Sequence, residues 1–293
     1  MKITLSQFAG FCDGVRRAFE IVDNLESDKV KKPVYVLGSL VHNQDVVRKI
    51  EEKGIRKIDL ETFAKAESGE IGTLIITAHG AGPQIYEMAR EKNIDVVDTT
   101  CPKVIKVQRL AQAYSKRGYA VVLVGDKDHK EVKSIFEWGN GQATVISNRE
   151  DLKNIDLAQS EKIIILSQTT QSRDFVDEVY GFVKEKYPAA EIADTICLAT
   201  NQRQGEVKEI ARENDAVVVI GSPESANSTR LYEIAKSLND KAVFVENDEA
   251  MPECGFFKGM EKVAVTAGAS TPDWIIERVI ARLEGCKNSL NAV

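Results

Sequence analysis

Three cysteines carry the clearest chemical signal in the sequence. Cys12, Cys101 and Cys197 each stand just before a segment with helical periodicity, and they recur once in each of three units of about 90 residues. An isolated cysteine is more often a small buried hydrophobic residue, which is our interpretation of Cys254 and Cys286. Three converging thiolates could hold an iron–sulfur cluster in which one iron lacks a protein thiolate. Zinc bound by three cysteines is the alternative.

The three histidines, His42, His79 and His129, all lie in polar loops that follow short apolar runs. A lone histidine is usually structural or solvated, but matched positions in a repeat favour a shared role. The same loops carry small hydrogen-bond donors and glycines, which suit a phosphorylated anion at helix N-termini. These residues are Asn43, Gly80, Gly82, Thr169, Thr170, Ser225, Asn227 and Ser270. Each serine or asparagine taken singly also fits ordinary turn chemistry and helix capping.

Glu131 lies two residues after His129 in the same loop. A carboxylate beside an anion site is unfavourable unless it moves protons, so Glu131 is a candidate general acid. A solvated glutamate at the start of a helix is the alternative. Only Lys127, Lys130 and Arg230 could add positive charge near these loops, so phosphate capture by a basic patch is not indicated.

The elements that position these residues alternate between strand and helix. Six short runs rich in β-branched residues pass into polar loops, and strands buried on both faces have this pattern. They are residues 33–43, 73–82, 119–132, 162–172, 216–231 and 262–273. Helical periodicity predicts helices over 13–27, 102–116, 174–187 and 272–283. Alternation of this kind predicts an α/β fold with parallel sheets.

Three repeats of the order cysteine, helix, strand-loop, helix, strand-loop cover nearly the whole chain. We therefore expect three small α/β domains in a pseudo-threefold arrangement, with the strand carboxyl ends directed towards a shared centre. Ligands bind beyond the carboxyl ends of parallel strands, so that centre is the expected site. The predicted domains are residues 13–101, 102–194 and 195–293, and residues 1–12 complete the third.

Composition excludes several classes of protein. Lys and Arg total 39 against 45 Asp and Glu, and the net charge of −6 argues against a nucleic-acid binder. No apolar run approaches the ~20 residues that span a bilayer. The first residues have no signal-peptide pattern. We therefore expect a cytoplasmic protein, and no disulfides because the cytosol keeps thiols reduced. We also expect a monomer.

At these residues the chain resembles the 4-hydroxy-3-methylbut-2-enyl diphosphate reductase family, also called the IspH or LytB family. The matching motifs run in the family's order from residue 10 to residue 273. They are GFCDGV, LVHNQ, TAHG, DTTCPKV, HKEV, QTTQS, ICLATNQRQ, GSPESANSTRL and TAGASTPD. Any one motif is weak, but the combination is highly specific.

The resemblance implies a [4Fe–4S] cluster on Cys12, Cys101 and Cys197 with an open apical iron, inside a cloverleaf of three α/β domains. It implies that Thr169 approaches the substrate hydroxyl and that Glu131 supplies protons. The implied reaction removes the C4 hydroxyl of (E)-4-hydroxy-3-methylbut-2-enyl diphosphate. It gives isopentenyl and dimethylallyl diphosphate, the last step of the non-mevalonate isoprenoid pathway. The implied diphosphate contacts are His42, His79, His129, Ser225, Asn227 and Ser270.

Two residues depart from the family pattern. Lys130 stands where proline is usual and could alter the pose of Glu131. Ala226 stands where a serine often lies in the diphosphate site, and its backbone N–H could still serve there. No G-x-G-x-x-G fingerprint for a flavin or nicotinamide is present, so we expect an external electron donor such as ferredoxin or flavodoxin. A zinc hydrolase or lyase and a non-catalytic diphosphate-binding protein remain the alternatives.

Overall fold

The computed structural model describes residues 1–26 and 28–291, and this part of the chain contains three four-stranded sheets. Every strand pairing in them is parallel. The first sheet holds β1 (Lys2–Leu5), β12 (Lys262–Ala267), β10 (Ala216–Ile220) and β11 (Ala242–Val245). The second holds β3 (Arg56–Ile58), β2 (Val34–Leu37), β4 (Thr73–Ile76) and β5 (Asp95–Asp98). The third holds β7 (Thr144–Ile146), β6 (Ala120–Val124), β8 (Ile163–Ser167) and β9 (Glu191–Ile192).

The three sheets share one strand order. It reads β3-β2-β4-β5 in the second sheet, β7-β6-β8-β9 in the third and β11-β10-β12-β1 in the first. The amino-terminal strand β1 therefore takes the place that β5 and β9 take in the other sheets. The predicted α/β class with parallel sheets is confirmed, and so are the six strands predicted from the apolar runs.

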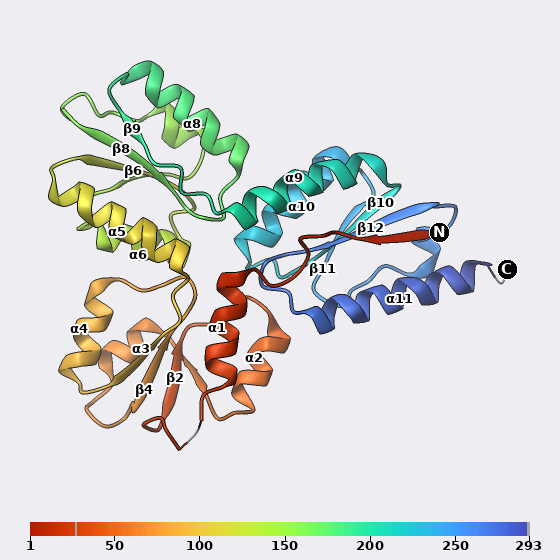
Figure 1. Cartoon of the computed structure of the whole chain (residues 1–293), viewed down its shortest axis with the longest axis horizontal. Coiled ribbons are helices and arrows are strands. Elements are labelled where there is room, and N and C mark those ends of the chain that lie inside the picture. Colours follow the sequence, from red (N-terminus) through yellow and green to blue (C-terminus); the bar gives the residue numbers. More distant parts are fainter. Residues whose placement is uncertain (27, 292–293) are drawn as a thin grey trace. The chain divides into compact units, whose positions relative to one another are not determined.

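Helices connect the strands and pack on the sheets (Figure 1). The shorter ones are α2 (Gln44–Glu51), α3 (Leu60–Lys65), α4 (Pro83–Glu91), α6 (Lys130–Trp138), α7 (Arg149–Lys153) and the 3-10 helix η1 (Cys254–Phe257). The longer ones are α1 (Asp13–Asp23), α5 (Pro102–Lys116), α8 (Arg173–Lys186), α9 (Leu198–Glu213), α10 (Ala226–Leu238) and α11 (Asp273–Asn291). Helix α5 has the predicted bounds, whereas α1 ends before residue 27 and α11 continues beyond residue 283. Ser27 and residues 292–293 lie outside the described residues.

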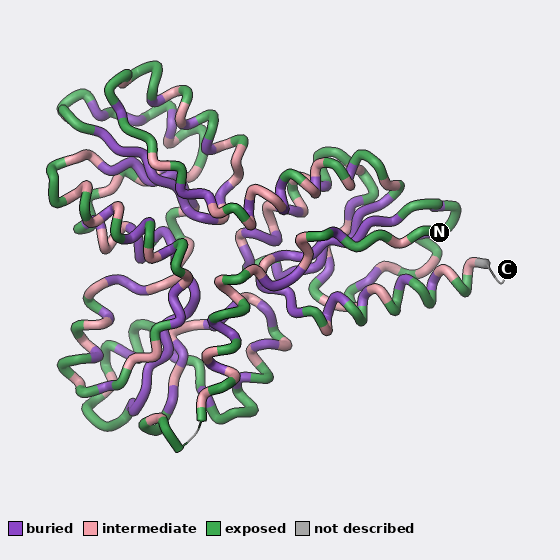
Figure 2. Tube along the Cα trace, viewed as in Figure 1, coloured by how far each residue is buried: buried purple, intermediate pink, exposed green. Residues whose placement is uncertain are grey.

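The apolar strands are continuous because both of their faces are covered. In the third sheet Val121 and Leu123 pack with residues of α5 and α6, whereas Val122 and Val124 pack with residues of α7 and α8. Successive side chains point to opposite faces of a strand, so two-sided burial needs an unbroken apolar run. Figure 2 shows the burial of the central strands and the exposure of the outer helix faces.

The chain forms two compact units. One contains residues 1–13, 42–46 and 198–293 with the first sheet, and the other contains residues 14–41 and 47–197 with the second and third sheets. The predicted boundaries between three domains stay a prediction. None of the described helices is both long and apolar enough for a transmembrane span.

The expectation of no disulfide is wrong for Cys254 and Cys286. These two cysteines are bonded, with their Cα atoms 4.9 Å apart. Cys286 lies within α11 and is only 1% exposed. The two residues stand 32 positions apart. They meet because α11 packs against η1, a tertiary contact that cysteine spacing does not reveal.

Candidate functional site

Two of the predicted histidines lie together in the unit that holds the second and third sheets. His79 follows β4 and His129 follows β6, and their rings meet edge to face with centroids 5.2 Å apart. His129 is the N-cap of α6, where its Nδ1 accepts a hydrogen bond from the backbone N–H of Glu131 at 3.2 Å. An Nδ1 that accepts leaves the proton of a neutral imidazole on Nε2. His129 can therefore donate to an anion through Nε2.

The His79 loop is held by residues of neighbouring helices. Ser134 of α6 donates to the carbonyl oxygen of His79 at 3.2 Å, and Gln108 of α5 donates to Ser134 at 3.1 Å. Gly80 has a φ of +77°, and a Cβ there would lie 2.4 Å from the Gln108 amide nitrogen. Gln108 and Ser134 were not predicted as site residues, because no motif or spacing in the sequence marks residues that act through packed helices.

Glu131 is buried rather than solvated, with only 2% of its surface exposed. Its carboxylate accepts from the backbone N–H of Thr169 at 2.6 Å and from the Thr169 hydroxyl at 3.0 Å. Burial raises the pKa of Glu131 to about 7, although the two bonds from Thr169 act in the opposite direction. A carboxyl group with this pKa is populated in both protonation states at neutral pH, which suits general acid–base chemistry.

The three cysteines predicted as ligands have the same local setting. The backbone N–H of Cys101 donates to Ala78 after β4, that of Cys197 to Thr169 after β8, and that of Cys12 to Ala269 after β12. All three carry half-buried thiols. Each cysteine directly precedes a helix, α5, α9 and α1 respectively. Every one of these thiols is thus fixed to a loop at the carboxyl end of a central strand.

Space beside Cys101 is kept open by a glycine. A Cβ added to Gly14, in the first turn of α1, would come within 2.4 Å of the Cys101 sulfur. Soft thiolate ligands of this kind suit iron–sulfur clusters or zinc. The donor set and the open space therefore fit a metal centre.

A second group of predicted residues lies in the other unit, around the start of α10. Ser225 caps this helix and accepts hydrogen bonds from the hydroxyls of Ser228 at 3.0 Å and Ser270 at 3.2 Å. Asn227 is 6% exposed, and its amide nitrogen has no hydrogen-bond partner in the described part of the chain. A buried donor without a partner is costly and calls for a ligand or water. Ala226 is the first residue of α10, where the backbone N–H has no partner within the helix.

His42 and Asn43 precede α2 in this same unit. His42 Nδ1 lies 3.3 Å from a carboxylate oxygen of Glu224. Asn43 accepts from the backbone N–H groups of Asp45 and Val46 at 3.1 and 3.2 Å. Asn43 therefore caps α2, which is the structural alternative that its position also allowed.

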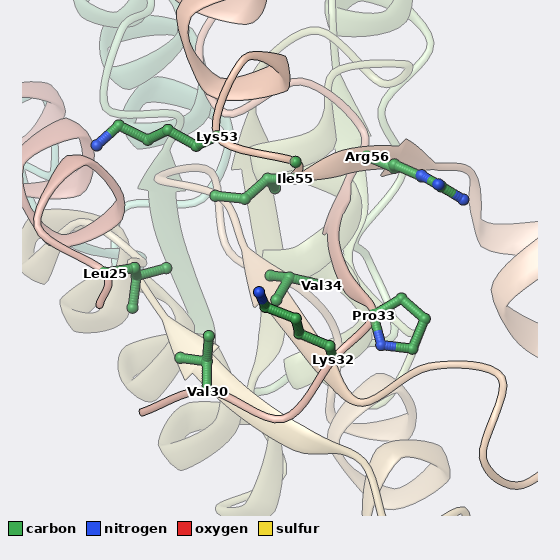
Figure 3. Close-up of a pocket in the computed structure, with 9 residues that line it drawn as sticks. Leu25, Val30, Lys32, Pro33, Val34, Lys53, Ile55 and Arg56 are labelled. Atoms are coloured by element: carbon green, nitrogen blue, oxygen red, sulfur yellow. The ribbon is translucent and has the colours of Figure 1, made fainter. Parts of the chain in front are cut away.

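Figure 3 shows residues that line a cavity, whose volume is about 450 Å³. Its lining includes Lys32, Pro33 and Val34 at the start of β2, together with Ile55 and Arg56 at the start of β3. Those are the amino ends of the strands. Ligands of parallel sheets bind at the opposite ends, so we assign this cavity no part in the site.

Comparison with known proteins gives one family. The family model described as "LytB protein" matches residues 3–284. Among curated relatives, 4-hydroxy-3-methylbut-2-enyl diphosphate reductase of Alkaliphilus oremlandii is 36% identical over 284 residues, covering 97% of this chain and 99% of the relative. The Bacillus subtilis protein of the same name is 38% identical over 94% of this chain and 88% of the relative. The chain spans only 43% of the relative from Clostridium acetobutylicum, at 37% identity.

Two solved structures are similar over nearly the whole chain. The E-1-hydroxy-2-methyl-but-2-enyl-4-diphosphate reductase of Plasmodium falciparum has a TM-score of 0.87 at 31% identity, covering 95% of this chain and 86% of that one. A second structure, described as (E)-4-hydroxy-3-methyl-but-2-enyl diphosphate reductase, the terminal enzyme of the non-mevalonate pathway, has a TM-score of 0.69 at 36% identity. It covers 97% of this chain and 100% of that one.

Proposed function

This chain belongs to the LytB protein family, and we infer that it is an oxidoreductase, a 4-hydroxy-3-methylbut-2-enyl diphosphate reductase of isoprenoid biosynthesis. Within the chain, the buried pair of Glu131 and Thr169 gives the strongest support for this function. It places a carboxyl group with a pKa of about 7 beside a hydroxyl. Glu131 stands two residues after His129, and the Thr169 carbonyl accepts a hydrogen bond from the backbone N–H of Cys197. A reductive dehydroxylation needs such a proton source.

We propose that Cys12, Cys101 and Cys197 hold an iron–sulfur cluster, of the [4Fe–4S] type with its apical iron open. Their attachment to three strand-end loops and the space left by Gly14 support this assignment. When bound, the cluster would supply electrons to the allylic substrate and Lewis acidity to its leaving oxygen. The protein contributes the thiolates, the orientation of the substrate and the exclusion of water.

The diphosphate is bound by the loop donors predicted from the sequence. His129 donates through Nε2, and the amide of Asn227, which has no protein partner, donates to a phosphate oxygen. The N-terminal backbone N–H groups of α10, including that of Ala226, add a favourable dipole for an anion. The full proposed set is His42, His79, His129, Thr169, Ser225, Ala226, Asn227 and Ser270.

Glu131 supplies the proton that the leaving hydroxyl needs. In its protonated form Glu131 passes a proton to the Thr169 hydroxyl, which donates its own proton to the substrate oxygen. The oxygen then leaves as water instead of hydroxide. In balance, the C4–O bond breaks, two electrons enter the allyl system and one proton leaves with the oxygen as water. A second proton adds to carbon, at C4 to give dimethylallyl diphosphate or at C2 with a shift of the double bond to give isopentenyl diphosphate. The products are isopentenyl and dimethylallyl diphosphate, which makes this the last step of the non-mevalonate pathway.

Anaerobic turnover of the hydroxylated diphosphate with reduced methyl viologen tests this function. We expect a brown protein that consumes reductant and forms both isoprenoid diphosphates. A zinc hydrolase or lyase would be colourless and would act without reductant, and a binding protein would bind the diphosphate without turnover. Either result would overturn the assignment. The external electron donor, the monomeric state and the cytoplasmic location stay predictions.

A further inference from the structure

Helix α5 has an unusual charge pattern. It carries Lys103, Lys106, Arg109 and Lys116 and no acidic residue, whereas every other α-helix in the described part of the chain contains at least one Asp or Glu. The chain as a whole has a net charge of −6. Helix α5 is therefore locally basic within a chain that is acidic overall.

The first three of these cations lie on one exposed face. Residues three apart are neighbours on a helix surface, so Lys103, Lys106 and Arg109 form a row. All three are exposed, whereas Val104 and Val107 of the same helix are buried. None of the three makes an ion pair with another described residue. They are free to meet a charge from outside the molecule.

This row begins at the proposed cluster ligand. Cys101 is the N-cap of α5. At about 1.5 Å of rise per residue, Lys106 lies ~7.5 Å and Arg109 ~12 Å from Cys101 along the helix axis. Arg17 of α1, also exposed, donates to the carbonyl oxygen of Thr100 at 3.3 Å and extends the positive surface around Cys101. We call Arg17, Lys103, Lys106 and Arg109 the α5 basic face.

We propose that the α5 basic face is the docking surface for an acidic electron-carrier protein that reduces the cluster held in part by Cys101. This rests on the proposed function. The sequence has no flavin or nicotinamide fingerprint, so electrons must come from another molecule. Complementary charge raises the rate of encounter and orients the partner, which suits brief contacts of small area between electron-transfer proteins.

Each docking event delivers one electron, and the carrier leaves oxidised. Two successive carriers supply the two electrons that, with two protons, break the C4–O bond, release water and form one new C–H bond on the allyl system. A carrier that leaves quickly is needed for the second to follow. A row of exposed cations suits such brief contacts. Exposed charges at an interface mainly affect the rate of association and its salt dependence, and they slow dissociation less.

A nucleic acid is the other acidic macromolecule that such a face could attract. Nucleic-acid-binding domains are usually basic overall, and this chain is acidic, so the face favours a small acidic protein. Binding of a phosphate backbone would also not require that the cations lie beside a proposed redox centre, whereas electron transfer would.

The test compares two electron donors on the same holoenzyme. The triple variant Lys103→Glu, Lys106→Glu, Arg109→Glu reverses the face, and Lys116→Glu is the matched control on the same helix, ~22 Å along the axis from Cys101. With an acidic ferredoxin or flavodoxin at low salt, we expect the triple variant to lose at least ~10-fold in kcat/KM for the donor. The control should stay within about twofold. With reduced methyl viologen, a small donor that needs no docking, all three proteins should turn over alike.

A second readout needs no turnover. The dissociation constant of the oxidised ferredoxin for the holoenzyme, measured by calorimetry without substrate, should rise in the triple variant and not in the control. The wild-type value should also rise with salt, and this dependence should flatten in the triple variant. If methyl viologen fails with wild type, the proposed reaction is wrong, but the docking surface is still decided by this binding measurement.

Three results would overturn the docking proposal. Equal losses with ferredoxin and methyl viologen would assign the face to folding or cluster binding. Unchanged ferredoxin kinetics and affinity in the triple variant would place the carrier elsewhere. Tight binding of an RNA duplex that the triple variant loses, without any effect on ferredoxin, would make the face a nucleic-acid site.

Discussion

The backbone N–H of Cys197 donates to the carbonyl oxygen of Thr169 at 3.0 Å. The same threonine donates its own N–H and its hydroxyl to the Glu131 carboxylate. One residue of the β8 loop thus ties a proposed cluster ligand to the proposed acid. A shift of this loop would therefore move the proposed cluster ligand and the proposed acid together.

Glu131→Gln separates proton delivery from substrate binding. Glutamine retains the shape of the side chain but cannot donate the carboxyl proton. We expect nearly normal substrate affinity and a turnover at least ~100-fold slower, within the range that a positioned acid contributes. Steady-state kinetics with methyl viologen and a binding titration measure the two effects. A variant with more than about a third of the wild-type rate would leave Thr169 or the substrate diphosphate as the proton source.

The raised pKa of Glu131 predicts how stability depends on pH. Burial holds the proton on the folded protein up to a pH of about 7, whereas the ordinary value is 4.5. Between these values unfolding releases a proton, so this group's contribution to stability is full below about 4.5 and is lost as pH rises through about 7. Thermal unfolding of wild type and Glu131→Gln should show it. The advantage of wild type at pH 4.5 should shrink or reverse by pH 8, and parallel curves would contradict this.

Substitution of the cysteines should divide them into two groups. Cys12→Ser, Cys101→Ser and Cys197→Ser should each abolish the cluster, measured as iron and sulfide per chain. Cys254→Ser and Cys286→Ser should keep the iron but lower the melting temperature, because the disulfide joins α11 to η1. Loss of iron from Cys254→Ser alone would refute the three-ligand assignment.

Gly14→Ala should weaken the metal centre without weakening the helix. Alanine is the better helix former by about 1 kcal/mol, but its Cβ would lie 2.4 Å from the Cys101 sulfur. We expect less iron per chain and a changed visible spectrum. Gly181→Ala is the control, because Gly181 lies within α8 and has nothing within 4 Å of an added Cβ. Full iron content in Gly14→Ala would mean that the thiol does not need this space.

The histidines should affect substrate rather than metal. His42→Ala, His79→Ala or His129→Ala each removes a proposed donor to the diphosphate, and a hydrogen bond to a charged group contributes ~1.5–3 kcal/mol. We expect affinity to fall by roughly one to two decades while iron and sulfide remain at the wild-type level. Inhibition by inorganic pyrophosphate provides an independent measure of the same contacts. Loss of iron from a histidine variant would instead indicate a metal ligand.

The sequence alone determined the fold class and the central strands. Strands such as β6 and β10 are buried on both faces, so they need unbroken apolar runs that can be recognised without a structure. Helix α5 was equally clear, because Pro102 starts it and apolar periodicity continues to its end. Parallel strands put their loops at one edge of the sheet, so the sequence allowed candidate residues to be named, and their roles stay predictions.

The remaining strands were decided by tertiary context. β5 and β9 lie at the edges of their sheets and contain no buried residue, so they carry no continuous apolar run. β1 pairs with β12, which stands about 260 residues later, and no local pattern encodes a partner at that separation. The same holds for the Cys254–Cys286 bond, which depends on where α11 packs.

The protonation of Glu131 was also decided by tertiary structure. From spacing alone, a solvated glutamate and a buried acid are equivalent, because both stand at the start of a helix. Only the packed structure removes Glu131 from water and places Thr169 against its carboxylate. Burial, the cause of its pKa of about 7, is a property of the surroundings that the residue's neighbours in sequence do not specify. Residue types and their order therefore indicated which chemistry was possible. Packing set the pKa of Glu131, and with it the pH range in which this residue can donate a proton.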